Sequence, residues 1–150
     1  MSIKNFLNFE RKFVPKPWGG EDWIANSPLY CGKDLFIKKD KRLSLHYHKL
    51  KTETFFIQSG IVELVFYQDP ALDDRFQSWN DFDGIIYNTN EEFDYPPGLE
   101  ELNLEAGDSF LVPVGMRHTL FAYQDAHIFE FSTQHFDEDS IKIICSSTFK

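Results

Sequence analysis

The stretch HYHKLKTETFFIQSG, residues 46–60, places two histidines one residue apart and a glutamate five residues after the second. It continues a segment, residues 42–48, in which Leu, Leu and Tyr alternate with Ser, His and His. Strict alternation is typical of a strand with two different faces, so His46 and His48 are expected to project from the same face. A charged, turn-like patch then leads to Glu53, and that turn can bring its carboxylate towards the two imidazoles.

A third histidine, His118, ends the stretch GDSFLVPVGMRH, residues 107–118. Imidazole nitrogens combined with one carboxylate suit Zn, Fe, Mn, Ni or Co, and they leave coordination positions open for a substrate or water. A structural zinc site, in contrast, is normally closed by four ligands, often thiolates. We therefore expect His46, His48, Glu53 and His118 to bind one divalent metal ion, with zinc as the first choice. A histidine pair alone more often marks a polar strand face, so the expectation depends on all four residues.

Most of the remaining sequence also alternates with a period of two, which predicts one all-β domain over residues 1–150. Many short strands at this spacing indicate a sandwich or a barrel. Helical periodicity is weak, with short candidates only at the N-terminus and around Ala71 to Trp79. Besides residues 42–48, the expected strands are 34–39, 54–60, 61–68, 108–114, 118–124 and 127–133.

Acidic residues are concentrated in one segment of a chain whose formal charge is -9. Between Asp69 and Glu105 there are eleven acidic residues and one basic residue, Arg75. Turn-forming sequences such as Asp-Pro, Asp-Gly and Tyr-Pro-Pro-Gly interrupt residues 68–105, so we expect a long acidic loop with at most one strand, near residues 84–88. The overall charge argues against a nucleic-acid partner, which would require a basic face.

The chain shows no sign of a membrane segment or of a disulfide framework. No apolar run approaches the roughly 20 residues that span a bilayer, so no membrane partner and a cytoplasmic location are expected. The only cysteines, Cys31 and Cys145, have neither CxxC spacing nor a partner pattern, and we interpret them as buried and reduced.

The two histidine-containing stretches resemble the two sequence motifs of the cupin superfamily. Glu53 and Gly60 follow His46 at the intervals of the first motif, while Gly107, Pro113 and Gly115 precede His118 at the intervals of the second. The resemblance implies a double-stranded β-helix, or jelly-roll barrel, with the metal between the strands that bear the motifs. The long acidic segment is then an insert between the two motifs. Since many cupins pair, the resemblance also implies a homodimer.

Two positions depart from these motifs, and the turn glycines have a role of their own. Asp40 stands where cupins usually have a leading glycine, and Ala122 stands where an asparagine is usual. Neither change removes a metal ligand. Gly60 and Gly115 lie where tight turns need a positive φ, so they support the fold more than the chemistry.

Three further segments resemble type II phosphomannose isomerases and the cupin domains attached to sugar nucleotidyltransferases. They are KPWGGEDW at residues 16–23, LSLHYHKLKTE at 43–53 and FEFSTQHFDED at 129–139. The resemblance implies an aldose–ketose isomerisation between mannose 6-phosphate and fructose 6-phosphate. In the implied mechanism a proton moves between adjacent carbons through an enediolate that the divalent ion stabilises.

An isomerase of this kind needs a proton carrier and groups that hold the sugar or sugar phosphate. Glu21 and Lys51 are the catalytic candidates, with Glu63 and Glu130 as other carboxylates that could point into a barrel; for each, a solvated or hydrogen-bonded group is the commoner case. Sugar contacts are expected from Lys49, Arg117 and Trp79. Trp18 and Trp23 are interpreted as core residues, and His127 and His135 as ordinary strand-end or surface histidines.

Three departures from the isomerase pattern keep other functions open. Thr119 follows His118 where related isomerases have an arginine, and Arg117 would point to the opposite face of its strand. The acidic insert should repel a phosphorylated substrate, and the usual Asp-x-Tyr-Gly-Arg ending is missing. The alternatives are a non-catalytic cupin that binds a sugar or sugar nucleotide, and a cupin dioxygenase or decarboxylase, since the same ligands serve iron or manganese.

Overall fold

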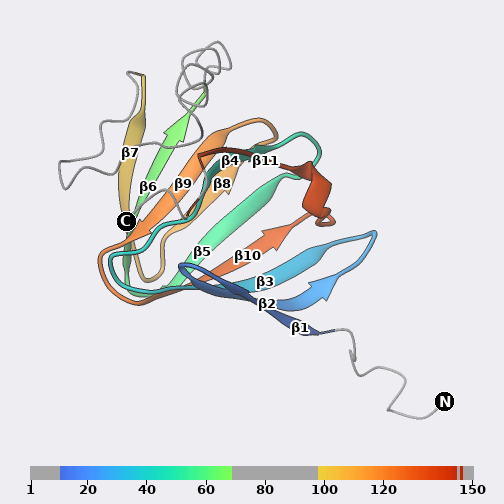
Figure 1. Ribbon diagram of the computed structural model, residues 1–150, viewed down its shortest axis with the longest axis horizontal. Helices are drawn as coiled ribbons and strands as arrows, with labels where there is room; N and C mark the ends of the chain where they lie inside the picture. Colours follow the sequence, from blue (N-terminus) through green and yellow to red (C-terminus); the bar gives the residue numbers. More distant parts are fainter. Residues whose placement is uncertain (1–10, 69–97, 145, 147–150) are drawn as a thin grey trace.

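The computed structural model describes residues 11–68, 98–144 and 146, which form two antiparallel sheets around a common interior (Figure 1). The first sheet has the strand order β1-β2-β3-β10-β5-β8. Its strands are β1 (Lys12–Lys16), β2 (Gly19–Asn26), β3 (Cys31–Ile37), β5 (Glu53–Ser59), β8 (Ser109–Val112) and β10 (Ala126–Ser132).

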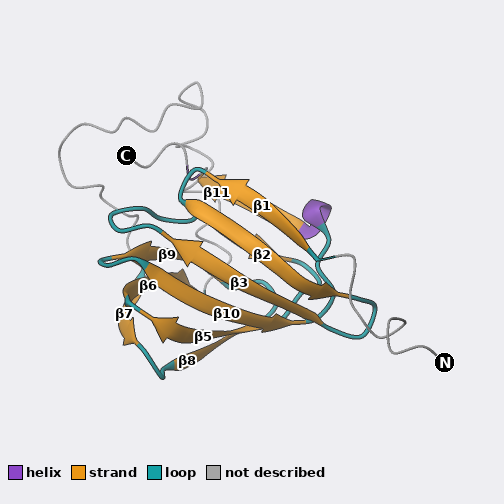
Figure 2. Cartoon of the chain, turned by 90° about the horizontal axis from the view of Figure 1, so that it is seen from below, coloured by secondary structure: helices purple, strands orange, loops and turns teal. Residues whose placement is uncertain are grey.

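The second sheet has the order β11-β4-β9-β6-β7 and faces the first across the interior (Figure 2). Its strands are β4 (Leu45–His48), β6 (Ile61–Tyr67), β7 (Glu100–Glu105), β9 (Arg117–Ala122) and β11 (Ser140–Ile144). A single 3-10 turn, Asp137–Asp139, joins β10 to β11. Because the chain alternates between the sheets, residues distant in the sequence become neighbours, as at the pairing of His46 with His118.

The inner faces of the strands change from apolar to polar along their length. On β10 the inward residues begin with Ala126 and Ile128 and end with Glu130, and all three are buried. On β9 the order is reversed, with His118 before Leu120. Apolar inner residues of both sheets pack into one hydrophobic cluster, so one half of the interior is a core and the other half is available for a polar site.

The structure confirms the all-β barrel, and it corrects the expected extent of the acidic loop. Glu100–Glu105 is strand β7, paired with β6, so the last residues of the insert belong to the barrel. Strands β2 and β11 were not expected, and β1 occupies Lys12–Lys16 near the N-terminus. The expected strand near residues 84–88 and helix near Ala71 to Trp79 lie outside the described residues. No helix in the described part is long and apolar enough to cross a bilayer.

The two motif departures, Asp40 and Ala122, are neighbours in the barrel. Asp40 has a φ of 63°, so the position does require the left-handed conformation that glycine favours, and Asp is one of the few other residues that adopt it readily. Its backbone N–H donates to the carbonyl of Ala122 at 2.8 Å. Gly60 and Gly115 have φ values of 88° and 85°, which confirms the expected turn geometry. The turn therefore keeps its shape without the usual glycine.

Candidate metal centre

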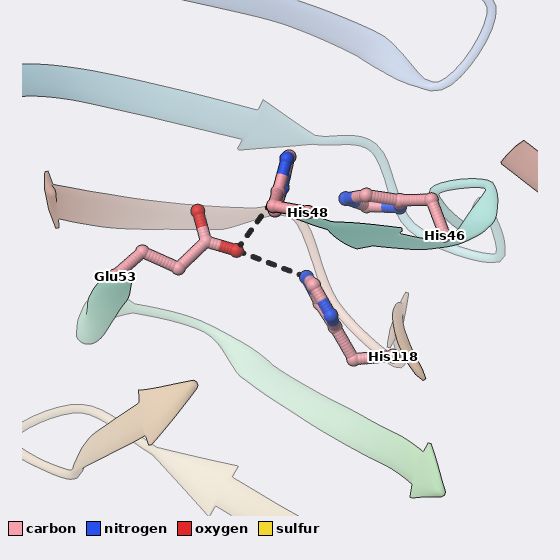
Figure 3. A group of neighbouring side chains, drawn as sticks. All are labelled: His46, His48, Glu53 and His118. Carbon is pink, nitrogen blue, oxygen red and sulfur yellow. Dashed lines mark ion pairs between the residues drawn. The ribbon is translucent and has the colours of Figure 1, made fainter. Parts of the chain in front are cut away.

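The four predicted ligands converge in the polar half of the interior (Figure 3). His46 and His48 project from the same face of β4, and His118 comes from the neighbouring strand β9. Glu53 is the first residue of β5, in the opposite sheet. One ligand atom from each residue lies within 4.8 Å of the others, so the group could hold one metal ion. Alternation on β4 and the turn before β5 therefore bring the residues together as the sequence predicted.

Hydrogen bonds to the protein backbone fix the orientation of two of the histidines. Nδ1 of His46 lies 2.8 Å from the carbonyl oxygen of Ser44, and Nδ1 of His118 lies 2.9 Å from that of Met116. A carbonyl only accepts, so a proton is assigned to Nδ1 of each ring. That assignment leaves the Nε2 lone pairs free to coordinate a metal, which is the usual arrangement around ligating histidines.

The protonation of the cluster suits a metal ion. Burial, with the neighbouring histidines, lowers the pKa of His46 well below its usual value. Burial and the charge of Lys51 lower the pKa of His48 to about 3, so both imidazoles are neutral near pH 7. Metal ligation requires that neutral form.

Unpartnered atoms provide an independent test of whether the residues fit a cation. Oε1 of Glu53 lies 3.0 Å from Nε2 of His118 and 3.6 Å from Nε2 of His48. Among the described residues, neither Oε1 of Glu53 nor Nε2 of His118 has a hydrogen-bond partner, although both are buried. Two buried acceptors this close repel each other unless a cation lies between them. The donor set and its unsatisfied atoms therefore fit a divalent ion.

A pocket of about 480 Å³ opens from this cluster, and its lining is rich in charge. Its volume is within the range of small-molecule sites. The acidic residues that line it are Glu21, Glu53, Glu130 and Asp137. The basic residues are the five lysines Lys12, Lys16, Lys33, Lys51 and Lys142. A divalent ion would add to this excess of positive charge, so the pocket favours an anionic or strongly polar ligand.

Lys51, a catalytic candidate, is buried beside the metal cluster. Its Nζ lies 3.2 Å from Oε2 of Glu53, 3.0 Å from Oε2 of Glu130 and 3.3 Å from Nδ1 of His135. Burial alone would lower the pKa of Lys51, but the charges of Glu130 and Glu53 raise it. Burial would likewise raise the pKa of Glu130, and the charges of Lys51 and Lys33 lower it. Lys51 is thus held as an ammonium and Glu130 as a carboxylate.

Glu21, the other catalytic candidate, also lines the pocket. Its Oε1 lies 3.3 Å from Nζ of Lys33, and its Oε2 lies 3.3 Å from Nζ of Lys16. Glu130 lies in the pocket as well, whereas Glu63 accepts a hydrogen bond from the hydroxyl of Tyr123 on an exposed surface. Two of the three carboxylates considered as proton carriers are therefore in the site.

The structure places two of the three expected substrate-binding residues outside the pocket lining. Lys49 is exposed and does not line the pocket. Arg117 does not line it either: its guanidinium lies 3.8 Å from the ring centroid of Tyr47 and donates to the carbonyl of Gly115. This follows from the alternation of β9, on which His118 takes the inward position. Trp79 lies outside the described residues.

Several pocket residues were not recognised from the sequence. His135 was interpreted as an ordinary strand-end or surface histidine; it does follow the end of β10, but its side chain lines the pocket and contacts Lys51. No sequence pattern marks it, because it follows the end of β10. Lys33 could have been recognised as a pocket residue, because alternation along β3 puts it on the same buried face as Cys31, Leu35 and Ile37. A charge among inward-facing apolar residues is a signal of function. Trp18 is in the core, as expected, whereas Trp23 is half-buried and lines the pocket.

No protein-family model matches the chain, and no curated protein matches it significantly. Solved structures do match the chain. CapF, a capsular polysaccharide assembling protein from Staphylococcus aureus, matches with a TM-score of 0.64 and 14% identity, over 93% of this chain and 34% of CapF. A variant of oxalate decarboxylase from Bacillus subtilis matches with a TM-score of 0.64 and 12% identity, over 89% of this chain and 30% of the enzyme.

A third structure, KdgF from Halomonas sp., has a length similar to that of this chain. It matches with a TM-score of 0.59 and 15% identity, over 88% of this chain and 94% of KdgF. The chain thus spans about a third of CapF and of the decarboxylase but nearly all of KdgF. At these identities the likeness concerns the fold. The two facing sheets and these neighbours together show that the chain has the cupin fold, a jelly-roll barrel.

Proposed function

We propose that this protein is a metal-dependent isomerase that interconverts an aldose and a ketose, with a sugar or sugar phosphate such as mannose 6-phosphate as substrate. The observation that carries the proposal is the position of the His46, His48, Glu53 and His118 cluster in a pocket lined by lysines and carboxylates. Sugar hydroxyls need both donors and acceptors, and the pocket supplies both. The isomerase-like segments of the sequence support the same reaction.

The pocket residues can take different roles in the proton transfer. A divalent ion held by the cluster would polarise a carbonyl oxygen of the substrate. Lys51, held as an ammonium, can exchange its 3.3 Å contact with His135 for a hydrogen bond to a substrate oxygen that gains negative charge. Glu130, whose pKa is lowered, is a weak base and is better suited to accept hydrogen bonds from hydroxyls. Glu21 is then the carboxylate that carries the proton between the adjacent carbons.

Turnover by metal-loaded protein tests the proposal. We expect conversion of at least one compound in a panel of hexose and pentose phosphates, followed by proton NMR with exchange of the transferred hydrogen in heavy water. His46→Ala should lose both bound metal and turnover, whereas His127→Ala should keep both. His127 is the matched control because it is paired with Asp34 outside the cluster.

Glu21→Gln separates the proton carrier from the metal site. This variant should keep its metal and its ability to bind the sugar, and lose turnover by about a hundredfold or more. Turnover that survives in Glu21→Gln would assign the proton transfer to another group. A folded, metal-loaded protein that converts no member of the panel contradicts the isomerase proposal as a whole.

A further inference from the structure

The inner face of the first sheet carries a continuous row of polar side chains. Cross-strand pairing places Lys12 of β1 beside Trp23 of β2, Trp23 beside Lys33 of β3, and Lys33 beside Glu130 of β10. All four side chains line the pocket. Directly opposite residues on one face of a sheet lie within contact distance, so these four side chains form a continuous surface.

Ionic contacts connect this row to the metal cluster at one end. Lys51 bridges the ligand Glu53 and Glu130, at 3.2 and 3.0 Å. Farther along the sheet, Glu21 bridges Lys33 and Lys16, at 3.3 Å to each. We call the six residues Lys12, Lys16, Glu21, Lys33, Lys51 and Glu130 the charged wall. Along it, ammonium donors alternate with carboxylate acceptors.

Exposure increases along the charged wall with distance from the cluster. Lys51 and Lys33 are buried, at 3% and 1% exposure. The side chain of Lys16 is 33% exposed, and Lys12 is exposed. A further exposed lysine, Lys142 of β11 in the opposite sheet, also lines the pocket. The pocket is therefore open to solvent at the end lined by Lys12, Lys16 and Lys142, which come from both sheets. We call these three residues the rim lysines.

Trp23 adds a second indication that a ligand lies along this wall. The Nζ atoms of Lys12 and Lys33 each lie 4.3 Å from its ring centroid, so it is held between two cations. Its indole N–H is buried and has no hydrogen-bond partner among the described residues. A buried donor without a partner is costly, and a hydroxyl or phosphate oxygen of a ligand would satisfy it.

We infer that the substrate binds as an extended phosphorylated polyol, with its reacting carbons at the metal cluster and its phosphate at the rim lysines Lys12, Lys16 and Lys142. This inference rests on the proposed function and names the orientation of the substrate. The hydroxyls between the two ends meet the carboxylate of Glu130 and the ammonium of Lys33, an acceptor and a donor. Lys49 and Arg117, which do not line the pocket, take no part.

Binding measured by calorimetry tests the orientation independently of turnover. The ligand is the phosphorylated sugar that metal-loaded protein converts fastest, or mannose 6-phosphate if none is converted, compared with the same sugar without phosphate. The triple variant Lys12→Gln, Lys16→Gln, Lys142→Gln should bind the phosphorylated sugar about 10- to 100-fold more weakly, since each lost charge-assisted hydrogen bond weakens binding. Its affinity for the unphosphorylated sugar should not change.

Lys49→Gln is the matched control, because it removes the same charge from an exposed lysine that does not line the pocket. A second variant, Lys142→Gln alone, changes an exposed residue of the opposite sheet and should still weaken phosphate-dependent binding severalfold. Equal losses in Lys49→Gln and in the triple variant, or no binding of the phosphorylated sugar by the wild type, would overturn the inference. If the triple variant loses phosphate-dependent binding and the wild-type protein converts no sugar, that pair of results would support the binding orientation and contradict the isomerase proposal.

Discussion

Asp139 is a single residue on which the geometry of the metal centre depends. It is buried, and its carboxylate accepts hydrogen bonds from the backbone N–H groups of Lys49, Leu50 and Lys51 at 2.9, 2.9 and 3.0 Å. Its Oδ2 also lies 3.9 Å from Nδ1 of His48. One carboxylate thus holds the turn between β4 and β5, and that turn delivers Lys51 and Glu53 to the site.

Replacement of this carboxylate should loosen both the turn and the metal site. We expect Asp139→Ala to lower the free energy of unfolding by about 3 kcal/mol, because buried N–H groups lose a charged partner. Asp139→Asn keeps one acceptor oxygen and should lose less. Urea unfolding and metal titration measure the two effects. Glu138→Ala, at the exposed neighbouring position, is the control, and an Asp139→Ala protein as stable as this control would show that the turn does not need the carboxylate.

At the scale of elements, Gly60 joins β5 to β6 at a turn with no room for a side chain. A Cβ atom there would lie 2.5 Å from the carbonyl oxygen of Asp125, in addition to the strain of a φ of 88°. Gly107 has a similar φ of 97°, but a Cβ atom would meet nothing within 4 Å. A side chain at Gly107 would meet backbone strain alone, whereas one at Gly60 would meet both backbone strain and steric overlap.

Alanine at the two positions should give different losses of stability. Gly107→Ala should cost about 1 kcal/mol from the left-handed backbone alone. Gly60→Ala should cost that amount and about 1 to 3 kcal/mol more, because the chain must move to relieve the overlap. Chemical denaturation of the two variants gives the comparison. Equal losses would mean that the β5–β6 turn adjusts freely.

Sequence patterns predicted the strands that have one apolar buried face and missed those that do not. β5, β6 and β10 carry alternating apolar residues and were expected. β7, with the sequence EELNLE, is an edge strand that buries only Leu104, and its short alternation of two leucines is too weak a pattern to mark a strand. β2 turns Glu21 and Trp23 towards the pocket, and a strand that lines a polar site lacks the apolar pattern by which strands are recognised.

For the whole molecule, the metal ligands join the two sheets of the barrel. His46, His48 and His118 belong to one sheet, and Glu53 belongs to the other. A bound ion would therefore hold the sheets together in the polar half of the interior, where few apolar contacts do so. Binding to the folded state alone stabilises that state by mass action.

Removal of the metal should accordingly lower the melting temperature. With free metal at a hundredfold excess over its dissociation constant, the stabilisation is about 2.7 kcal/mol. For a chain of this length, that corresponds to about 5 to 11 °C. Thermal melts of chelated protein before and after addition of Zn²⁺ measure the shift, and His118→Ala should show none. Identical melting of the chelated and the metal-supplemented wild type would mean that the cluster binds no zinc.

The ligand set could be predicted because local spacing records most of it, whereas most of the pocket lining beyond Glu21 and Lys51 could not. Three of the four ligands lie within eight residues of one another. The pocket charges come from positions as far apart as Lys12 and Lys142, and only strand pairing brings them together. The expected homodimer stays a prediction, which light scattering can check.

The separation of the metal ligands from most of the charged wall has a consequence for protein engineering. The ligands lie on β4, β5 and β9, while Lys12, Lys16, Glu21 and Lys33 lie on β1, β2 and β3. Randomising these four wall positions leaves the four candidate metal ligands untouched. A library restricted to them should yield variants with new ligand preferences while most members still load metal, so ligand specificity can be changed on β1, β2 and β3 separately from metal binding.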